Sequence, residues 1–175
     1  METVKEYVDV RKLIYSALFV IGALVLPQLF HMVGWEGPTF LPMNIPVILA
    51  GFILGKKYGL ITGIAAPVIS TLVSGMPIAF PVLPIMILQY GAYGFAAGYL
   101  SKDVKLPAAV TVLATMIFGW AAYAIGFYAL ELLIVPTISS SLSPISAIVT
   151  GVPGIIISIL AIPMIVKIIK DKKEE

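Results

Sequence analysis

Six long hydrophobic stretches occupy most of the chain, and short polar or turn-rich segments separate them. A transmembrane helix needs about 20 consecutive, mostly apolar residues, so this pattern predicts six transmembrane helices. We expect them at Leu13–Val33, Pro42–Gly55, Tyr58–Ser74, Val82–Leu100, Leu106–Ile134 and Ile145–Ile169. The predicted fold class is an all-α integral membrane protein, with one transmembrane domain over residues 1–175. Within it, residues 1–12 form an amphipathic lead and residues 170–175 a polar tail.

All eleven Lys and Arg residues lie in alternate connections of this pattern. They precede the first stretch, separate the second from the third and the fourth from the fifth, and close the chain: Lys5, Arg11, Lys12, Lys56, Lys57, Lys102, Lys105, Lys167, Lys170, Lys172 and Lys173. The other three connections, Gly34–Leu41, Gly75–Pro81 and Val135–Pro144, contain no basic residue. By the positive-inside rule, we expect the N and C termini, the lead and the tail to be cytoplasmic, and these three loops to face outside.

The composition indicates that the protein is solvated by a lipid bilayer. Of the 175 residues, 60% are hydrophobic and 11% are charged, whereas a soluble domain is about 25% charged. The net charge of +2 is small, and the basic residues lie next to the predicted membrane spans. This placement favours contact with anionic lipid head groups over nucleic acid. A signal peptide is the alternative for the first stretch, but no small-residue cleavage site follows it, so we expect a retained helix.

Few residues could support catalysis or metal binding. The chain has no cysteine and a single histidine, His31, so we expect no thiolate or histidine metal site and no cofactor. An intramembrane hydrolase would have only His31 and Ser74 as base and nucleophile, and no G-x-S-x motif surrounds Ser74. A glycine-rich nucleotide-binding motif is also absent. We therefore predict that the protein is not an enzyme.

Glycines recur every four residues in two places. Gly51, Gly55, Gly59 and Gly63 cross the connection between the second and third helices, and Gly94 and Gly98 repeat the spacing on the fourth. Such small-residue faces let helices approach closely in lipid. Internal packing and a smooth surface for a partner subunit are the two interpretations.

Aromatic and amide side chains share faces of the fourth and fifth helices. Gln89 and Tyr93 are four residues apart, and Trp120, Tyr123 and Phe127 follow at spacings of three and four. Glu131 lies one turn farther along. A carboxylate within the membrane either contacts a ligand or reaches the membrane–water interface, and both alternatives are open for Glu131. Such a set suits a flat, polar-edged small molecule. Helix packing is the alternative explanation for the stripe.

Two consecutive segments resemble the substrate-binding S components of energy-coupling factor (ECF) transporters. They are FLPMNIPVILAGFILG (Phe40–Gly55) and YGLITGIAAPVISTLVSGMP (Tyr58–Pro77). The segments QYGAYGFAAGYL (Gln89–Leu100) and GVPGIIISILAIP (Gly151–Pro163) are similar to the family's fourth and sixth helices. The likeness covers residues 40–170.

The resemblance implies a six-helix protein of the prokaryotic plasma membrane that binds a water-soluble vitamin or vitamin precursor from outside. It also implies docking on a transmembrane T component with two ABC-type ATPases, and a toppling of the S component that moves its site inward. Pantothenate, niacin, pyridoxine-type compounds and cobalamin precursors all stay open as ligands. A stand-alone carrier or channel is the alternative, and an assembly protein without ligand is another.

The resemblance also suggests which residues act. We expect ligand contacts at Trp35, Asn44, Gln89, Tyr93, Trp120, Tyr123 and Glu131. We expect partner docking at Ser16, Ala17, Ala23, Gly94 and Gly98. The docking motif is imperfect, because relatives often have an alanine pair four apart and Ile21 follows Ala17 at that spacing. Gln89, Trp120 and Ser158 stand where relatives often have Glu, Arg and Gln, which implies an unusual or less charged ligand.

Overall fold

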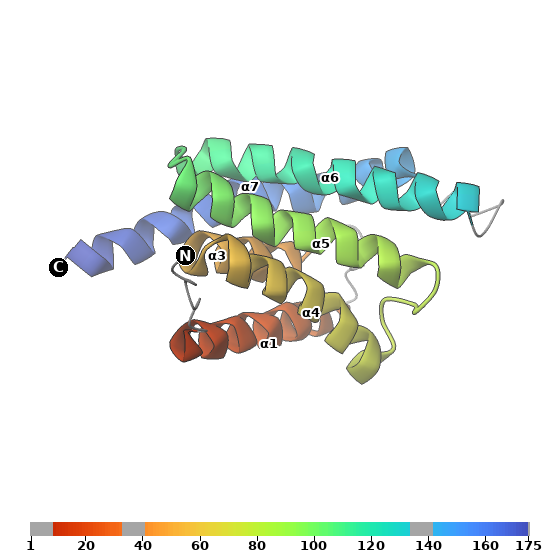
Figure 1. The fold of residues 1–175 in the computed structure, drawn as a ribbon, viewed down its shortest axis with the longest axis horizontal. Helices are drawn as coiled ribbons and strands as arrows, with labels where there is room; N and C mark the ends of the chain where they lie inside the picture. The colour runs from red at the N-terminus through yellow and green to blue at the C-terminus, as the bar shows by residue number, and fades with distance from the viewer. Residues whose placement is uncertain (1–8, 33–40, 134–141, 175) are drawn as a thin grey trace, which may run out of the picture.

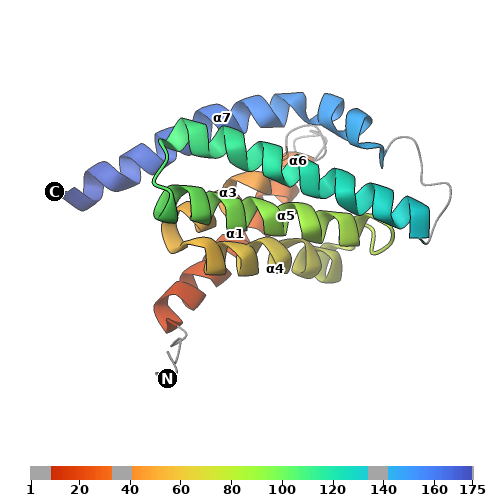
Figure 2. The same cartoon turned by 45° about the horizontal axis from the view of Figure 1, so that its top comes forward.

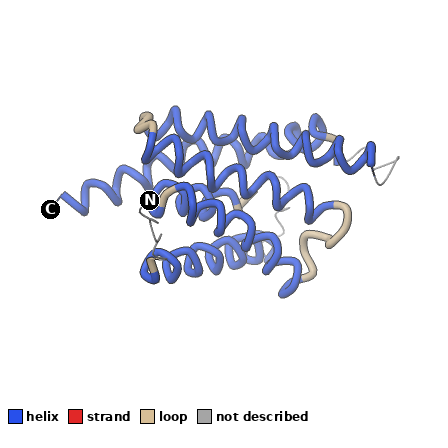
Figure 3. The backbone as a smooth tube through the Cα atoms, viewed as in Figure 1, coloured by secondary structure: helices blue, strands red, loops and turns tan. Residues whose placement is uncertain are grey.

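The structure, a computed structural model, describes residues 9–32, 41–133 and 142–174, and these form a bundle of helices (Figures 1 and 3). The elements are α1 (Val10–Met32), α3 (Asn44–Leu54), α4 (Lys56–Ser74), α5 (Val82–Gly98), η1 (Tyr99–Asp103), α6 (Ala108–Leu133) and α7 (Pro144–Glu174). The element η1 is a single π-helical turn that continues α5. No strand occurs in the described ranges, and the all-α fold class is confirmed there.

Four helices are long and apolar enough to cross a membrane, namely α1, α4, α6 and α7. The helix α3 has 11 residues, or about 16 Å of helix, against a hydrocarbon core of about 30 Å. Nine of these residues are buried, so neighbouring helices enclose α3 on nearly all sides. The predicted second span is therefore a short, enclosed helix, which the bilayer tolerates because protein surrounds its ends.

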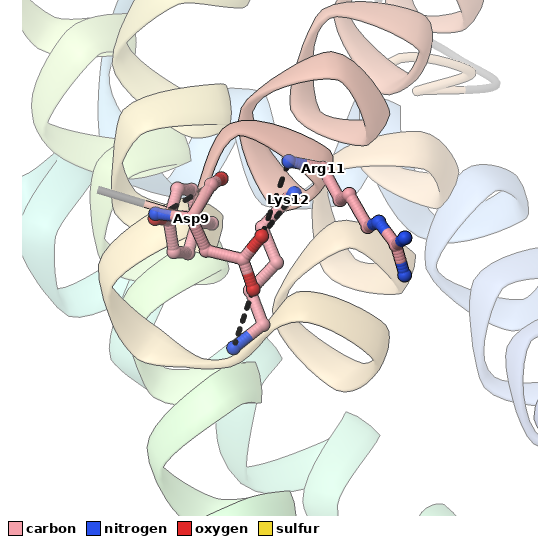
Figure 4. A network of polar contacts seen from close by, with 4 residues as sticks. Asp9, Arg11 and Lys12 are labelled. Carbon is pink, nitrogen blue, oxygen red and sulfur yellow. Dashed lines mark hydrogen bonds and ion pairs between the residues drawn. The ribbon is translucent and has the colours of Figure 1, made fainter. Parts of the chain in front are cut away.

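Several helix boundaries differ from the prediction, and three of these differences lie next to basic residues. The helix α1 begins three residues before Leu13, because Asp9 Oδ1 accepts hydrogen bonds from the N–H groups of Arg11 (3.1 Å) and Lys12 (3.4 Å) (Figure 4). Only Gly55, with φ +92°, separates α3 from α4, so Lys56 begins α4. At the other end α7 continues past Ile169 to Glu174. Basic residues favour the negative end of a helix dipole, so the predicted tail extends the helix.

The basic connections lie together at one end of the bundle, where α1 begins and α7 ends (Figure 1). There the Asp9 N–H donates to the Tyr58 hydroxyl at 2.8 Å, which ties α1 to α4. The Lys56 ammonium pairs with Asp103 at 3.0 Å, which ties α4 to η1. The loop between α4 and α5 and the end of α6 lie at the opposite end (Figure 1). The side of the membrane that each end faces stays a prediction of the positive-inside rule.

Glycines bring the backbones of α3, α4 and α5 into direct contact. A Cβ at Gly59 would overlap the Gly94 carbonyl, and a Cβ at Gly94 would overlap the Gly59 carbonyl. A Cβ at Gly98 would likewise meet the backbone of Gly55 and Lys56. Gly94 and Gly98, which we predicted on a partner-docking face, are thus buried against α3 and α4. Their surfaces are occupied within the chain, and internal packing is the interpretation that fits them.

The helices α6 and α7 lie side by side along one flank of the bundle (Figures 1 and 2). Between them is a hollow of about 520 Å³ with almost entirely apolar walls. Its lining residues are Leu113, Met116, Ile117, Trp120, Ala121, Ile148, Ile155 and Ile159. The two helices therefore meet less closely than α4 and α5 do.

Candidate functional site

Six of the seven predicted ligand residues lie in the described part of the chain, on three helices. Asn44 is the first residue of α3, Gln89 and Tyr93 lie on α5, and the others lie on α6. The seventh, Trp35, lies outside the described residues. Asn44, Gln89, Tyr93 and Tyr123 are buried, whereas Trp120 and Glu131 are half-buried.

Gln89 and Tyr93 form a joint polar edge on α5. The Gln89 Nε2 group donates a hydrogen bond to the Tyr93 hydroxyl at 3.1 Å, and Tyr93 is fully buried. Its ring lies against Gly119 of α6 so closely that a Cβ there would overlap the ring. The glycine is what allows α6 to pass over the aromatic side chain. Because Gly119 directly precedes Trp120, this contact places the Gln89–Tyr93 pair next to the turn of α6 that contains Trp120.

Trp120 and Tyr123 join α6 to the segments that precede α3 and α7. Their ring centroids are 5.5 Å apart with an interplanar angle of 60°. The Tyr123 hydroxyl donates to the carbonyl of Leu142 at 2.9 Å, just before α7. A Cβ built at Gly151 of α7 would lie 2.9 Å from Leu41 and 3.6 Å from Trp120. The start of α3, the middle of α6 and the outer part of α7 thus converge on Trp120.

Several buried polar atoms on α3, α6 and α7 have no hydrogen-bond partner among the described residues. Asn44 is 1% exposed, yet neither its amide nitrogen nor its amide oxygen is paired. The indole N–H of Trp120 and the hydroxyls of Thr115 and Ser158 are also unpaired. Leaving such a group unsatisfied costs about 1–3 kcal/mol, so buried polar groups normally have partners. A bound solute or water would supply them.

Glu131 lies farther from the convergence than the other described residues. It follows Tyr123 by two turns of α6, with the buried Phe127 between them on the same face. The carboxylate therefore lies at the C-terminal end of the aromatic stripe on α6, its rim, rather than at its centre.

Sequence reasoning missed Thr115 and did not assign a role to Ser158. Thr111, Thr115 and Gly119 repeat every four residues and are all buried on α6. This stripe of polar and small residues within an apolar helix is the sequence feature that could have indicated Thr115. The predicted ligand residues were chosen for aromatic and amide chemistry, which hydroxyl groups do not share.

Hydroxyl groups at the end of α4 hold the loop Gly75–Pro81. Ser70 Oγ donates to the Met76 carbonyl at 2.6 Å, and Thr71 Oγ1 donates to the Pro77 carbonyl at 2.8 Å. A second hollow, of about 440 Å³, lies beside them between α1 and α4. Its lining includes the polar side chains of Gln28, Ser70 and Ser74, and the hydroxyls of Ser70 and Ser74 already donate hydrogen bonds to backbone carbonyls.

The predicted docking residues of α1 face in different directions. Ser16 is 2% exposed and Ala23 is 0% exposed, so both are covered within the chain. Ala17 is exposed and lies on the apolar face that α1 turns away from α3 and α4. Large side chains share this exposed face: Leu13, Ile14, Leu18, Ile21, Val25 and Leu29.

Metal binding finds no support in the described ranges, which contain no group of three or more His, Cys, Asp or Glu side chains that could hold an ion. The arrangement around Trp120 instead combines aromatic rings with uncharged hydrogen-bonding groups. Aromatic faces and uncharged hydrogen-bonding edges are the chemistry that suits a flat solute.

Comparison with known proteins identifies one family. The sequence profile described as "ECF transporter, substrate-specific component" matches residues 11–166, which is most of the chain. No curated protein and no solved structure matches the chain.

Proposed function

Because the chain belongs to the family of substrate-specific components of ECF transporters, we propose that it captures a small water-soluble vitamin or vitamin precursor. Membership makes the chain a substrate-binding subunit of a membrane transporter. In the proposed cycle the solute binds from outside a prokaryotic plasma membrane. The chain then docks on a transmembrane T component that carries two ABC-type ATPases, so ATP hydrolysis belongs to the partners.

The observation that supports capture is the set of unpaired buried polar groups on α3, α6 and α7. Among the described residues, Asn44 on α3 and the Trp120 indole N–H on α6 have no hydrogen-bond partner. The Gln89–Tyr93 pair lies on α5, where the Tyr93 ring packs on Gly119, the residue before Trp120. A solute with hydrogen-bond donors and acceptors along the edge of a ring would satisfy these groups. The hollow between α6 and α7 has a volume of about 520 Å³, and of its lining residues Trp120 alone belongs to the set of unpaired polar groups. That volume is within the range of about 300–1,000 Å³ typical of small-molecule sites.

Docking is best supported by α1, which packs on α3 and α4 and lies at the edge of the bundle (Figure 1). Only 17% of its most apolar 18-residue stretch is buried within the chain. Ala17 on this face gives a locally low surface for a partner helix, whereas Ser16 and Ala23 support α1 from inside. We therefore propose the exposed side of α1 as the contact with the T component.

Two preparations test this proposal. The purified chain is denatured and its extract is searched by mass spectrometry for a stoichiometric small molecule, which capture predicts because tight complexes dissociate slowly. The same solute is then supplied to proteoliposomes that contain the chain alone, or the chain with a T component and the ATPases. We expect ATP-dependent uptake only in the complete assembly. Uptake by the chain alone would instead establish a stand-alone carrier or channel.

A further inference from the structure

We infer that the captured solute carries no net negative charge at neutral pH and is a flat ring compound that is uncharged or cationic. This inference rests on the proposed function and concerns the same site. It follows from three features of the chain: where its cations are, how the outer helix ends are built, and which polar groups are left unpaired.

The first feature is the absence of basic side chains from the bundle interior and from its outer end. No Lys or Arg occurs in residues 13–55, 58–101 or 106–166. Lys102 is thirteen residues beyond Gln89, or about 20 Å along the helix. Trp120 is twelve residues beyond the start of α6, or about 18 Å. A carboxylate or phosphate bound at Trp120 would thus have no Lys or Arg side chain of the described residues within reach.

A buried anion without a counter-charge is strongly unfavourable. Transfer of an ionised carboxylate into an apolar medium costs far more than transfer of a neutral amide, unless the charge is paired. The usual pairing groups are the guanidinium of Arg and the ammonium of Lys, which bind carboxylate and phosphate by charge-assisted hydrogen bonds. A site without Lys or Arg side chains therefore disfavours an anionic solute.

The second feature concerns the helix N-termini, which are the other common source of positive potential. Three helices begin at the outer end, and each has a proline in its first three residues: Pro46 in α3, Pro84 in α5 and Pro144 in α7. Proline has no N–H to donate. Each helix end has therefore lost one of the donors that would hold an anion.

Most of the remaining donors at these helix ends are already used. The Asn44 N–H donates to the Leu41 carbonyl at 3.0 Å, and the Leu83 N–H donates to the Ile78 carbonyl at 3.1 Å. The Ser146 N–H donates to Ser143 Oγ at 3.3 Å. Each helix thus keeps at most one uncommitted N–H within its first three positions. An anion-binding site needs several such donors converging on one point.

The third feature is the chemistry of the unpaired groups. Asn44 offers both a donor and an acceptor, and the Trp120 indole offers a donor. These groups are neutral and match the edge of an amide, an aminopyrimidine or a hydroxypyridine ring. The carboxylate nearest along α6 is Glu131, at the rim of the aromatic stripe. Glu131 is eleven residues beyond Trp120, or about 16 Å along the helix, so it too lies beyond contact with a solute at Trp120.

The test uses pairs of compounds that share a ring or backbone and differ in charge. The purified full-length chain is incubated with an equimolar mixture of nicotinamide and nicotinate, pyridoxine and pyridoxine 5′-phosphate, thiamine and thiamine monophosphate, and pantothenol and pantothenate. After gel filtration the protein is denatured, and mass spectrometry quantifies what it retained, including any molecule carried from its cells. We expect the retained compound to be uncharged or cationic, and enriched at least tenfold over its anionic counterpart.

The outcomes separate the two claims. Retention of an anionic member, or of a cellular molecule that is an anion at pH 7, would overturn the charge inference while leaving capture intact. Retention of nothing, from the mixture or from the cells, would overturn the proposed function and this inference with it. Retention of an uncharged or cationic ring compound from either source would support both, whereas retention of pantothenol, which has no ring, would overturn the inference that the solute is flat.

Discussion

The contact between α4 and α5 and the contact between α6 and α7 are constructed in opposite ways. In the first, Gly59 and Gly94 bring two backbones together with no space for even one methyl group. In the second, large apolar side chains surround a hollow of about 520 Å³. Both pairs consist of neighbouring apolar helices in one chain, so the difference lies in side-chain size.

The comparison indicates a division of labour. In lipid the hydrophobic effect provides little drive for helix association, and close backbone packing of small residues takes its place. The half of the bundle formed by α3, α4 and α5 therefore provides a rigid frame. The pair α6 and α7 leaves room beside Trp120, where a solute can complete the packing. The predictions below test whether rigidity and looseness are distributed in this way.

The largest effect is expected at the closest contact. The substitution Gly94→Ala places a methyl group on the Gly59 backbone, which cannot rotate aside as a side chain can. We expect a loss of about 3 kcal/mol in unfolding free energy, at the upper end of the range for overpacking. The measurement is reversible unfolding in mixed micelles titrated with a denaturing detergent.

Gly91→Ala is the matched control for this variant. It adds the same methyl group to the same helix, but its nearest neighbours are the side chains of Ile64 and Leu60, both at 3.4 Å. A helix interior also favours Ala over Gly by about 1 kcal/mol, so Gly91→Ala is expected to be neutral or stabilising. Equal stability of the two variants would contradict the rigid-frame interpretation.

A separation of stability from binding is expected at Asn44. In Asn44→Leu a buried amide without a partner becomes an apolar side chain of similar size, so the apo protein should unfold no more easily. Affinity for the solute should fall by about 2 kcal/mol, or about thirtyfold, because two hydrogen bonds are lost. Binding is measured by calorimetry with the compound identified by mass spectrometry.

The control for Asn44 is Thr62→Val on α4. Thr62 is fully buried, and its hydroxyl donates to the Tyr58 carbonyl of its own helix at 2.8 Å. The nearly isosteric Val should leave affinity unchanged. If Asn44→Leu keeps full affinity, the unpaired amide has no role in capture, and the solute site does not include α3.

Much of the fold was predictable, because hydrophobic length and the positions of the basic residues carry the signal. The all-α class and the grouping of the basic connections at one end follow from these patterns. The short length of α3 was not predictable from hydropathy, since an enclosed helix is as apolar as a spanning one. The early start of α1 was missed because Arg11 and Lys12 seemed to exclude the helix, while Asp9 caps it.

Only part of the contacts among the candidate site residues was predictable. Aromatic and amide spacing indicated Gln89 and Tyr93, which form a hydrogen-bonded pair. The absence of partners for Asn44 could not be seen in the sequence, because it depends on which helices surround the residue. Which helices a glycine face packs against likewise depends on the arrangement of the helices around it. Spacing alone shows that Gly94 and Gly98 share a face of α5, but not that α3 and α4 cover it.

A smaller effect is expected at the ion pair that ties α4 to η1. Lys56 and Asp103 are 3.0 Å apart with side chains 45% and 42% exposed. An exposed pair of this kind contributes about 0.2–1 kcal/mol. A double-mutant cycle with Lys56→Ala and Asp103→Ala should give a coupling of about 0.5 kcal/mol that weakens as salt is raised. A coupling above about 2 kcal/mol would mean that this end of the frame depends on charge as well as on glycine packing.

The smallest change in stability is expected where the bundle is loosest. Ala121→Leu adds three carbon atoms to a residue that lines the hollow between α6 and α7. Because this space is unfilled, unfolding free energy should stay within about 0.5 kcal/mol of the parent. Gly119→Ala, on the same helix, adds one carbon that overlaps the Tyr93 ring and should be clearly destabilising. If the larger addition were the more damaging, α6 and α7 would have to close on each other in the membrane, and the space beside Trp120 would not be available to a solute.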